Sequence, residues 1–387
     1  MLAVLAPGQG SQKPGFLTPW LALPGAEARL RWWSVLAGVD LVHLGTEAGA
    51  EEIKDTAKTQ PLLVAAALLT AEQLPTYDAG VIAGHSVGEL AAATMAGVFS
   101  SEAAVTLAAV RGREMAAACA LEPTGMSAIL GGDPDEVIAT IEAAGLVPAN
   151  RNGAGQVVAA GSLPGLEKLA AAPPARARII SLQVAGAFHT PYMAPAEEAL
   201  AAISAGVTTA NPTRTLLSNR DGAAVDHGPS MLQRLVRQVT APVRWDLCMA
   251  ALVDLGVTAV IELAPAGTLA GLVKRTIKGI EIVTVNTPDD LDAARDVFAR
   301  HGGPPPTHEP HPQFSVVLST AAGTFTPADG LVEGAEVGDG QRIGAVQTPQ
   351  GPVDVTAHSA GTLAEWLVTL DDPVAPGQPL ARIGDQL

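Results

Sequence analysis

A serine in a glycine-rich turn is the strongest chemical signal in this sequence. Ser86 lies in the segment 84–88 (GHSVG), between an apolar run that favours a strand (80–83) and an alanine-rich run that favours a helix (89–96). In this strand–turn–helix context a G-x-S-x-G motif exposes its serine as a nucleophile. The start of the following helix offers free N–H groups to a developing negative charge. The alternative is a connecting loop with an incidental serine.

A serine nucleophile needs a base, and His189 is the best candidate. It stands in the segment 184–191 (VAGAFHTP), where a predicted strand ends and a proline begins a helix. His85 is adjacent to Ser86, but neighbours around a sharp turn point in different directions, so we expect His85 to pack against the turn. The alternative for His189 is a helix-capping or core histidine.

A serine nucleophile also needs donors for the oxyanion of a tetrahedral intermediate. The segment 7–12 (PGQGSQ) follows the first predicted strand and lacks the phosphate-binding pattern of an NTP site. Its glycines let backbone N–H groups approach a ligand closely. We therefore expect the backbone amides of Gln9 and Val87 to form a two-donor oxyanion hole.

Arg111 emerges from an apolar helical face, because Leu107, Ala108 and Met115 are its neighbours at helical spacing. A buried guanidinium without an anionic partner is costly. Glu114 is one candidate partner within the chain. The other interpretation is that Arg111 binds a substrate carboxylate, which the planar guanidinium suits better than a lysine does.

Composition limits the classes of function. The 387 residues have room for two or three domains, and no apolar run reaches the roughly 18 residues that a membrane-spanning helix needs. The first residues read as a strand and not as a signal peptide. A net charge of −16 argues against binding to nucleic acid or an anionic membrane. Cys119 and Cys248 lie far apart, which favours free thiols in the cytoplasm and no metal site.

Strands alternate with helices over residues 1–300, which predicts an α/β domain with a mainly parallel sheet. Within it, residues 124–187 read βαββαβ, the order of an inserted ferredoxin-like subdomain. The expected strands are 2–6, 80–83, 128–130, 157–160, 179–184, 216–218, 259–262 and 282–285, and three of the expected helices are 61–73, 101–120 and 230–239.

The remaining residues form a linker and a second domain. Residues 301–313 contain prolines and three histidines, and the prolines oppose a compact metal site. Residues 314–387 contain short apolar runs separated by glycine and proline, which predicts a small all-β domain.

Residues 1–300 resemble the malonyl-CoA:acyl carrier protein transacylases. The matching segments are 7–12 (PGQGSQ), 84–89 (GHSVGE), Arg111, 150–155 (NRNGAG), 186–189 (GAFH), 238–245 (QVTAPVRW) and 267–272 (GTLAGL). The resemblance implies a hydrolase-like parallel-sheet core. It implies Ser86 as nucleophile, His189 as base and Arg111 as the receptor of the malonyl carboxylate. The amides of Gln9 and Val87 would bind the oxyanion.

The same resemblance implies that a backbone carbonyl near Gln238 supports His189 in place of an acidic residue. It implies a ping-pong reaction in which Ser86 takes malonyl from coenzyme A and a holo acyl carrier protein collects it, for fatty-acid or polyketide synthesis. A coenzyme A thioester is then the substrate, and no cofactor is bound covalently. Phe188 resembles the malonyl-selective form of the motif.

The C-terminal residues 314–387 resemble a biotinyl/lipoyl-like barrel or sandwich. The segments 337–343 (VGDGQRI) and 372–380 (DPVAPGQPL) match its two half-motifs. Gln350 stands where such domains carry the modified lysine, and the last lysine of the chain is Lys278. We therefore expect neither biotin nor lipoate. The domain would serve in tethering, self-association or docking to an acyl-CoA carboxylase.

Two other functions remain open at this point. A serine esterase or thioesterase of α/β-hydrolase type would also use Ser86, but would need an acidic residue between the serine and the histidine. A non-catalytic scaffold built around residues 314–387 is the second. Lys274, Arg275 and Lys278 are either contacts for the carrier or coenzyme A phosphates, or ordinary surface residues.

Overall fold

The computed structural model describes residues 1–303, 314–357 and 360–384. The chain forms two compact units, Met1–Pro306 and Thr307–Leu387. Most of the predicted linker, residues 304–313, therefore lies outside the described residues, together with two of its histidines. Among the described helices, none is long and apolar enough to cross a membrane.

A six-stranded sheet forms the centre of the first unit, in the order β10-β9-β1-β2-β7-β8. Neighbouring strands are parallel except for β7 and β8. The strands are β1 (Leu2–Ala6), β2 (Val81–Gly84), β7 (Thr215–Leu217), β8 (Ala224–Val225), β9 (Ala259–Glu262) and β10 (Glu281–Thr284). Strands β1, β2 and β9 are buried along their whole length, as expected where helices cover both faces of a parallel sheet. The predicted α/β core is confirmed.

The strand order brings two predicted loops together. In the register of β1 and β2, Ala6 lies opposite Gly84. The loop that follows β1 and the turn that follows β2 therefore leave the same edge of the sheet. Ligands of open α/β sheets bind at this carboxyl edge of the strands.

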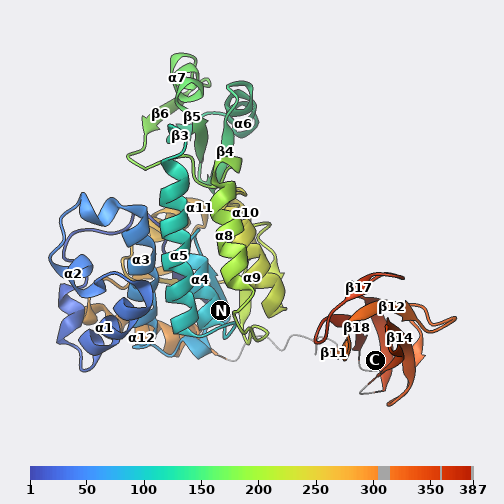
Figure 1. Cartoon of the computed structure of the whole chain (residues 1–387). Helices are drawn as coiled ribbons and strands as arrows, with labels where there is room; N and C mark the ends of the chain where they lie inside the picture. Colours follow the sequence, from blue (N-terminus) through green and yellow to red (C-terminus); the bar gives the residue numbers. More distant parts are fainter. Residues whose placement is uncertain (304–313, 358–359, 385–387) are drawn as a thin grey trace. The chain divides into compact units, whose positions relative to one another are not determined.

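Helices pack around this sheet (Figure 1). They are α1 (Ala26–Ala37), α2 (Leu41–Thr46), α3 (Thr56–Ala71), α4 (Gly88–Met95), α5 (Ser101–Cys119), α8 (Ala194–Ser204), α9 (Gly228–Arg237), α10 (Trp245–Asp254), α11 (Thr268–Thr276) and α12 (Leu291–His301). Short 3-10 helices are η1 (Thr18–Ala22), η2 (Glu52–Lys54), η3 (Thr76–Asp78), η4 (Pro191–Met193) and η5 (Pro288–Asp290). Helix α3 is buried on almost every side, as an apolar core helix must be.

The start of α3 corrects one prediction. The predicted helix spans residues 61–73 and so begins at Pro61. The observed helix begins at Thr56, since the Asp55 side chain accepts a hydrogen bond from the Ala57 N–H at 3.0 Å and caps the helix earlier. Pro61 thus lies inside the helix. The last predicted strand before His189 is also displaced: it covers Ala177–Ser181 and not 179–184, and an irregular segment leads from it to the histidine.

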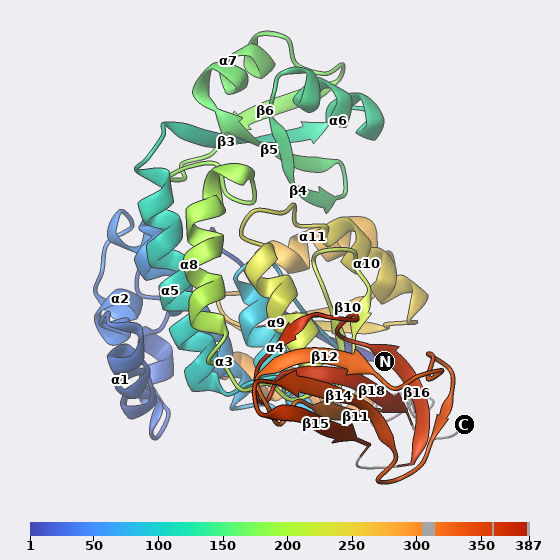
Figure 2. The same ribbon diagram turned by 45° about the vertical axis from the view of Figure 1, so that its right-hand side comes forward.

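Residues 124–181 form a separate lobe of the first unit, seen in Figures 1 and 2 as the part that carries α6 and α7. Its elements are β3 (Thr124–Gly131), α6 (Pro134–Ala143), β4 (Val147–Gly153), β5 (Gln156–Ser162), α7 (Leu163–Ala171) and β6 (Ala177–Ser181). The strands form an antiparallel sheet in the order β4-β5-β3-β6. Strand β4 joins this lobe to the rest of the unit, because Arg151 N–H donates to the Val243 carbonyl at 2.9 Å.

The second unit contains two antiparallel four-stranded sheets in its described part, β11-β18-β16-β13 and β15-β14-β12-β17. The strands are β11 (Phe314–Leu318), β12 (Gly323–Pro327), β13 (Glu336–Val337), β14 (Arg342–Thr348), β15 (Gly351–Thr356), β16 (Gly361–Trp366), β17 (Pro373–Val374) and β18 (Pro379–Gly384). Phe325, Ile343, Leu363 and Ile383 belong to its own buried core. In the hairpin of β14 and β15 the last pair is Thr348 and Gly351, which leaves Gln350 at the tip.

Candidate active site

The turn between β2 and α4 has no room for side chains at its two glycines. A Cβ at Gly84 would lie 2.2 Å from the backbone of Gly88, and a Cβ at Gly88 would lie 2.3 Å from the Ala6 carbonyl oxygen. Between them Ser86 has φ 52°, a left-handed conformation that costs an L-residue about 1–2 kcal/mol. Strain of this kind is characteristic of a nucleophile elbow.

Ser86 and His189 are joined by a hydrogen bond. The Oγ of Ser86 lies 2.8 Å from Nε2 of His189, and Nδ1 of the same ring lies 2.7 Å from the Gln238 carbonyl oxygen. Because a carbonyl can only accept, Nδ1 carries the proton and Nε2 is free to take one. Burial, followed by the positive charge of Arg111, lowers the pKa of His189 to about 3, so the ring is neutral.

Arg111 faces the same hydroxyl. Its Nη2 donates to Ser86 Oγ at 3.3 Å and to Gln238 Oε1 at 3.0 Å, while Nη1 donates to Gln60 Oε1 at 2.7 Å. Burial lowers the pKa of Arg111 to about 10, which leaves it protonated at neutral pH. Glu114 is not its partner, because that carboxylate pairs with Arg113 at 2.9 Å. The acceptors of this buried cation are therefore amide and hydroxyl oxygens.

The sequence did not point to Asn219, which positions the turn. Asn219 Oδ1 accepts from the Ser86 N–H at 2.8 Å, and its Nδ2 donates to the Gly84 carbonyl at 2.8 Å. The signal was present, since Asn219 stands two residues after β7, at the carboxyl edge beside β2.

Glu89 was also missed, because it reads as the first turn of a surface helix. Its side chain is buried, with Oε1 accepting from the Asn219 N–H at 2.7 Å and Oε2 accepting from Gln238 Nε2. Burial raises the pKa of Glu89 to about 8, although the bond from Asn219 and the charge of Arg111 act in the opposite direction.

The loop after β1 approaches the turn closely, as the sequence predicts. A Cβ at Gly8 would lie 2.6 Å from the His85 carbonyl oxygen. The Gln9 side chain is held by a 3.3 Å hydrogen bond to Thr56 Oγ1. Within the ranges that the structure describes, neither the Gln9 N–H nor the Val87 N–H donates to another residue.

His85 turns away from the Ser86 hydroxyl. Its Nε2 lies 2.9 Å from Asn152 Oδ1 on strand β4, and its ring packs edge-on against Trp245 at 5.7 Å. Burial lowers the pKa of this ring, so it stays neutral. His85 thus packs against the turn as expected and ties it to the lobe that carries β4.

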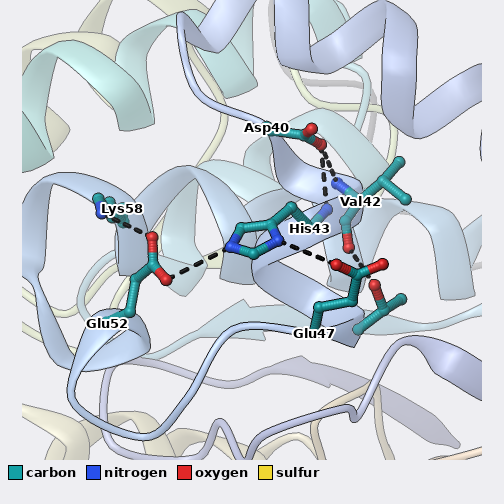
Figure 3. A network of polar contacts seen from close by, with 7 residues as sticks. Asp40, Val42, His43, Glu47, Glu52 and Lys58 are labelled. Atoms are coloured by element: carbon teal, nitrogen blue, oxygen red, sulfur yellow. Dashed lines mark hydrogen bonds and ion pairs between the residues drawn. The ribbon is translucent and has the colours of Figure 1, made fainter.

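His43 belongs to a surface network and not to this site. Figure 3 shows its ring between Glu47 and Glu52, each with a carboxylate oxygen 3.4 Å away, and Lys58 pairs with Glu52 at 2.8 Å. Hydrogen bonds that the ring donates to Glu52 and Glu47 raise the pKa of His43. In the described part of the chain, no group of three or more metal-binding side chains occurs.

The other predicted residues lie where the motif placed them or on the surface. Phe188 is buried directly before the histidine. Lys274 and Arg275 are exposed in the last turn of α11, and Lys278 is exposed just after that helix. Cys119 and Cys248 are free thiols.

Comparisons with known proteins agree with this geometry. The acyl transferase domain family matches residues 5–294. The malonyl CoA-acyl carrier protein transacylase of Mycobacterium tuberculosis H37Rv is 57% identical over 297 residues, which cover 76% of this chain and 98% of that protein. The protein of that name from Escherichia coli K12 is 33% identical, covering 76% of this chain and 99% of its own length.

Solved structures give the same result. The crystal structure of MCAT from M. tuberculosis matches with a TM-score of 0.74 at 56% identity, over 76% of this chain and 99% of that chain. A second match is the structure of a type II polyketide synthase acyl-carrier protein in complex with its malonyl-transacylase (PlMCAT:AntF). Its TM-score is 0.70 at 30% identity, and the match covers 76% of this chain and 99% of that chain. The chain therefore belongs to the malonyl CoA-acyl carrier protein transacylase family, as the motifs around Ser86 predicted.

Proposed function

We propose that this chain transfers the malonyl group of malonyl-CoA to the phosphopantetheine thiol of an acyl carrier protein, through a malonyl ester of Ser86. One observation carries the proposal. The Ser86 hydroxyl lies 2.8 Å from the His189 ring and 3.3 Å from the Arg111 guanidinium, so a nucleophile, a base and a receptor for a carboxylate meet at one point.

In the first half-reaction, Ser86 Oγ attacks the thioester carbonyl while His189 Nε2 takes the hydroxyl proton. The tetrahedral intermediate collapses, its C–S bond breaks, and the imidazolium returns the proton to the leaving coenzyme A thiolate. In the second, the carrier thiol attacks the malonyl ester, His189 takes the thiol proton and delivers it to Ser86 Oγ. The Gln238 carbonyl stabilises the imidazolium in both.

The oxyanion of each intermediate needs donors that are not otherwise engaged. The backbone amides of Gln9 and Val87 fill this role. Two observations support this assignment. The loop after β1 and the turn after β2 approach each other closely, and neither N–H has an acceptor among the described residues.

Arg111 gives the reaction its preference for a malonyl group. A guanidinium beside the nucleophile binds the free carboxylate of the acyl group, which acetyl groups lack. The buried ring of Phe188, next to the base, limits the space for an α-methyl substituent.

A serine esterase or thioesterase is the alternative. Enzymes of the α/β-hydrolase type support the histidine with a carboxylate. Here the partner of His189 Nδ1 is a backbone carbonyl, which favours the transferase.

The remaining proposals concern the other parts of the chain. The lobe of β3–β6 has the βαββαβ order of a ferredoxin-like subdomain. The C-terminal unit is a biotinyl/lipoyl-like domain, supported by its two sheets and by Gln350 at the hairpin tip. It serves in self-association or in docking to an acyl-CoA carboxylase.

The test is intact-mass detection of a malonyl adduct after mixing with malonyl-CoA, in the wild-type chain and in Ser86→Ala. We expect the adduct only in the wild type, and its transfer to holo carrier protein. An adduct on the variant would identify another nucleophile, and no adduct on either would favour the scaffold. Release of free malonate in place of transfer would favour the esterase.

A further inference from the structure

The side-chain amide of Gln238 has a defined orientation. Its Oε1 accepts from Arg111 Nη2 at 3.0 Å, and its Nε2 donates to Glu89 Oε2 and, at 3.3 Å, to Asn219 Oδ1. Gln238 is 5% exposed, so its side chain has little contact with bulk solvent. The amide therefore has an acceptor end that faces the cation and a donor end that faces the carboxylate.

Each partner constrains this amide in its own way. A guanidinium can only donate, so Gln238 must turn its oxygen toward Arg111. Both Glu89 oxygens accept in this structure, one from the Asn219 N–H and one from Gln238 Nε2. Above its pKa of about 8 the Glu89 carboxylate can only accept, so the Gln238 nitrogen must then turn toward it. The two demands agree, which keeps the amide in one orientation.

Glu89 is itself fixed to the nucleophile turn. Its Oε1 accepts from the Asn219 N–H at 2.7 Å, and the Asn219 side chain accepts from the Ser86 N–H at 2.8 Å. A continuous chain of hydrogen bonds thus runs from the backbone of Ser86 through Asn219, Glu89 and Gln238 to Arg111. It returns to Ser86 through the contact of Arg111 with Oγ.

We propose that Glu89 is a positioning residue, which fixes the orientation of the Gln238 amide and thereby holds Arg111 beside Ser86, ready for the substrate carboxylate. The proposal rests on the malonyl transfer proposed above and extends it to a residue that does not touch the substrate. Glu89 acts on Arg111, and not on His189, because the histidine is bound by the Gln238 backbone carbonyl.

Replacement of Glu89 by Gln separates these roles. In Glu89→Gln the new amide must turn its oxygen to the Asn219 N–H, which leaves its NH₂ group facing Gln238. The Gln238 amide then turns its own oxygen toward residue 89 and presents its NH₂ group to Arg111. Two donors face each other there, so the guanidinium loses an acceptor and its fixed position, while the backbone contact to His189 is unchanged.

The experiment measures loading of Ser86 by malonyl-CoA and by acetyl-CoA, at about pH 9, above the pKa of Glu89. Inactivation by phenylmethylsulfonyl fluoride, a serine reagent without a carboxylate, reports on the reactivity of Ser86 with no contribution from carboxylate binding. We expect Glu89→Gln to lower the malonyl-to-acetyl ratio of kcat/KM on the order of tenfold, mostly through KM, because a charge-assisted hydrogen bond is lost. The rate of inactivation should stay within about twofold of wild type.

Two further variants make the test specific. Glu197→Gln is the matched control, since Glu197 lines the same 220 Å³ cavity as Glu89 but bonds to Thr240 and not to the Gln238 side chain. It should behave as wild type. Gln238→Met removes the amide, so adding Glu89→Gln to it should not lower the malonyl-to-acetyl ratio further.

The proposal would be overturned by an unchanged malonyl-to-acetyl ratio in Glu89→Gln. It would also be overturned if both acyl groups and the neutral reagent slowed equally, or if the two substitutions lowered the ratio additively. Failure of the proposed function looks different, because wild-type protein would then form no malonyl adduct on Ser86 or would release free malonate in place of transfer.

Discussion

The guanidinium of Arg111 lies 3.3 Å from the Ser86 hydroxyl, and its other acceptors are the side-chain amides of Gln60 and Gln238. Neutral acceptors hold the cation in place without cancelling its charge. The charge is therefore still available to a substrate carboxylate attached at the hydroxyl. Arg111 is 2% exposed, which strengthens such a contact relative to one in water.

Replacement of Arg111 by Lys tests this arrangement. An ammonium group cannot span Gln60 and Gln238 and also face Ser86. We expect kcat/KM for malonyl-CoA to fall roughly 10- to 100-fold, while acetyl-CoA loading falls little or rises. Single-turnover loading with both thioesters measures the ratio, and an equal loss for both would contradict a role in carboxylate binding.

The pH dependence of Ser86 acylation tests the environment of His189. The neutral ring is the base, and its pKa of about 3 keeps it neutral far below the ordinary 6.5. The rate at which a neutral reagent acylates Ser86 should therefore show no decrease centred near pH 6.5. Between these values the unfolded chain binds a proton that the folded chain does not, so this group makes stability decrease as the pH falls. A fall in the rate of Ser86 acylation centred near pH 6.5 in the folded protein would contradict the prediction.

The pKa of Glu89 predicts an opposite effect on stability. The folded chain retains the carboxyl proton up to about pH 8, whereas the unfolded chain releases it near 4.5. The folded state thus binds more protons in this interval, and the contribution of Glu89 to stability decreases as the pH rises through it. Urea unfolding should be measured for wild type and Glu89→Gln at several pH values. As the pH rises through this interval, the free energy of unfolding of the wild type should fall relative to that of the variant. A difference independent of pH would argue against the raised pKa.

The close approach at the turn predicts a large effect of one methyl group. In Gly84→Ala the new Cβ would lie 2.2 Å from the backbone of Gly88, so either the turn or the helix must move. We expect a loss of roughly 3 kcal/mol or more in the free energy of unfolding, with loss of loading. Gly271→Ala is the control, because it lies in α11 with no atom within 4 Å of the new Cβ, and it should gain about 0.5–1 kcal/mol. Equal stabilities in urea would refute the steric argument.

The division of the chain into two compact units predicts that the second is dispensable for acyl transfer. The residues that surround Ser86 all come from the unit Met1–Pro306. A chain that ends at Gly303 should load malonyl and pass it to holo carrier protein at rates within about twofold of the full chain. A loss of transfer with loading intact would instead assign carrier docking to residues 314–387.

The sequence was most informative where the chemistry depends on local structure. The turn around Ser86 and the apolar face around Arg111 can be read from a few adjacent residues. The predicted start of α3 at Pro61 was wrong, because the helix cap at Asp55 was overlooked.

Contacts between distant residues could not be predicted in the same way. Asn219 bonds to Ser86 across 133 positions, and Glu89 bonds to Gln238 across 149. Glutamate in the first turn of a helix is ordinarily a solvent-exposed residue. It is buried here beside residues that are distant in the sequence, because its two oxygens accept from Asn219 and Gln238. The alternative that Glu114 pairs with Arg111 was wrong for a similar reason, since spacing along a helix does not say which neighbour a side chain turns to.

The two residues that share the 2.8 Å hydrogen bond also share an unusual backbone, because Ser86 has φ 52° and His189 has φ 60°. Both positions would suit glycine better than the residue that occupies them. Backbone conformation alone would thus favour glycine over both Ser86 and His189. Only the reaction requires the serine and the histidine. If the chain ever lost its use as an enzyme, these two positions are where we would expect its sequence to relax first.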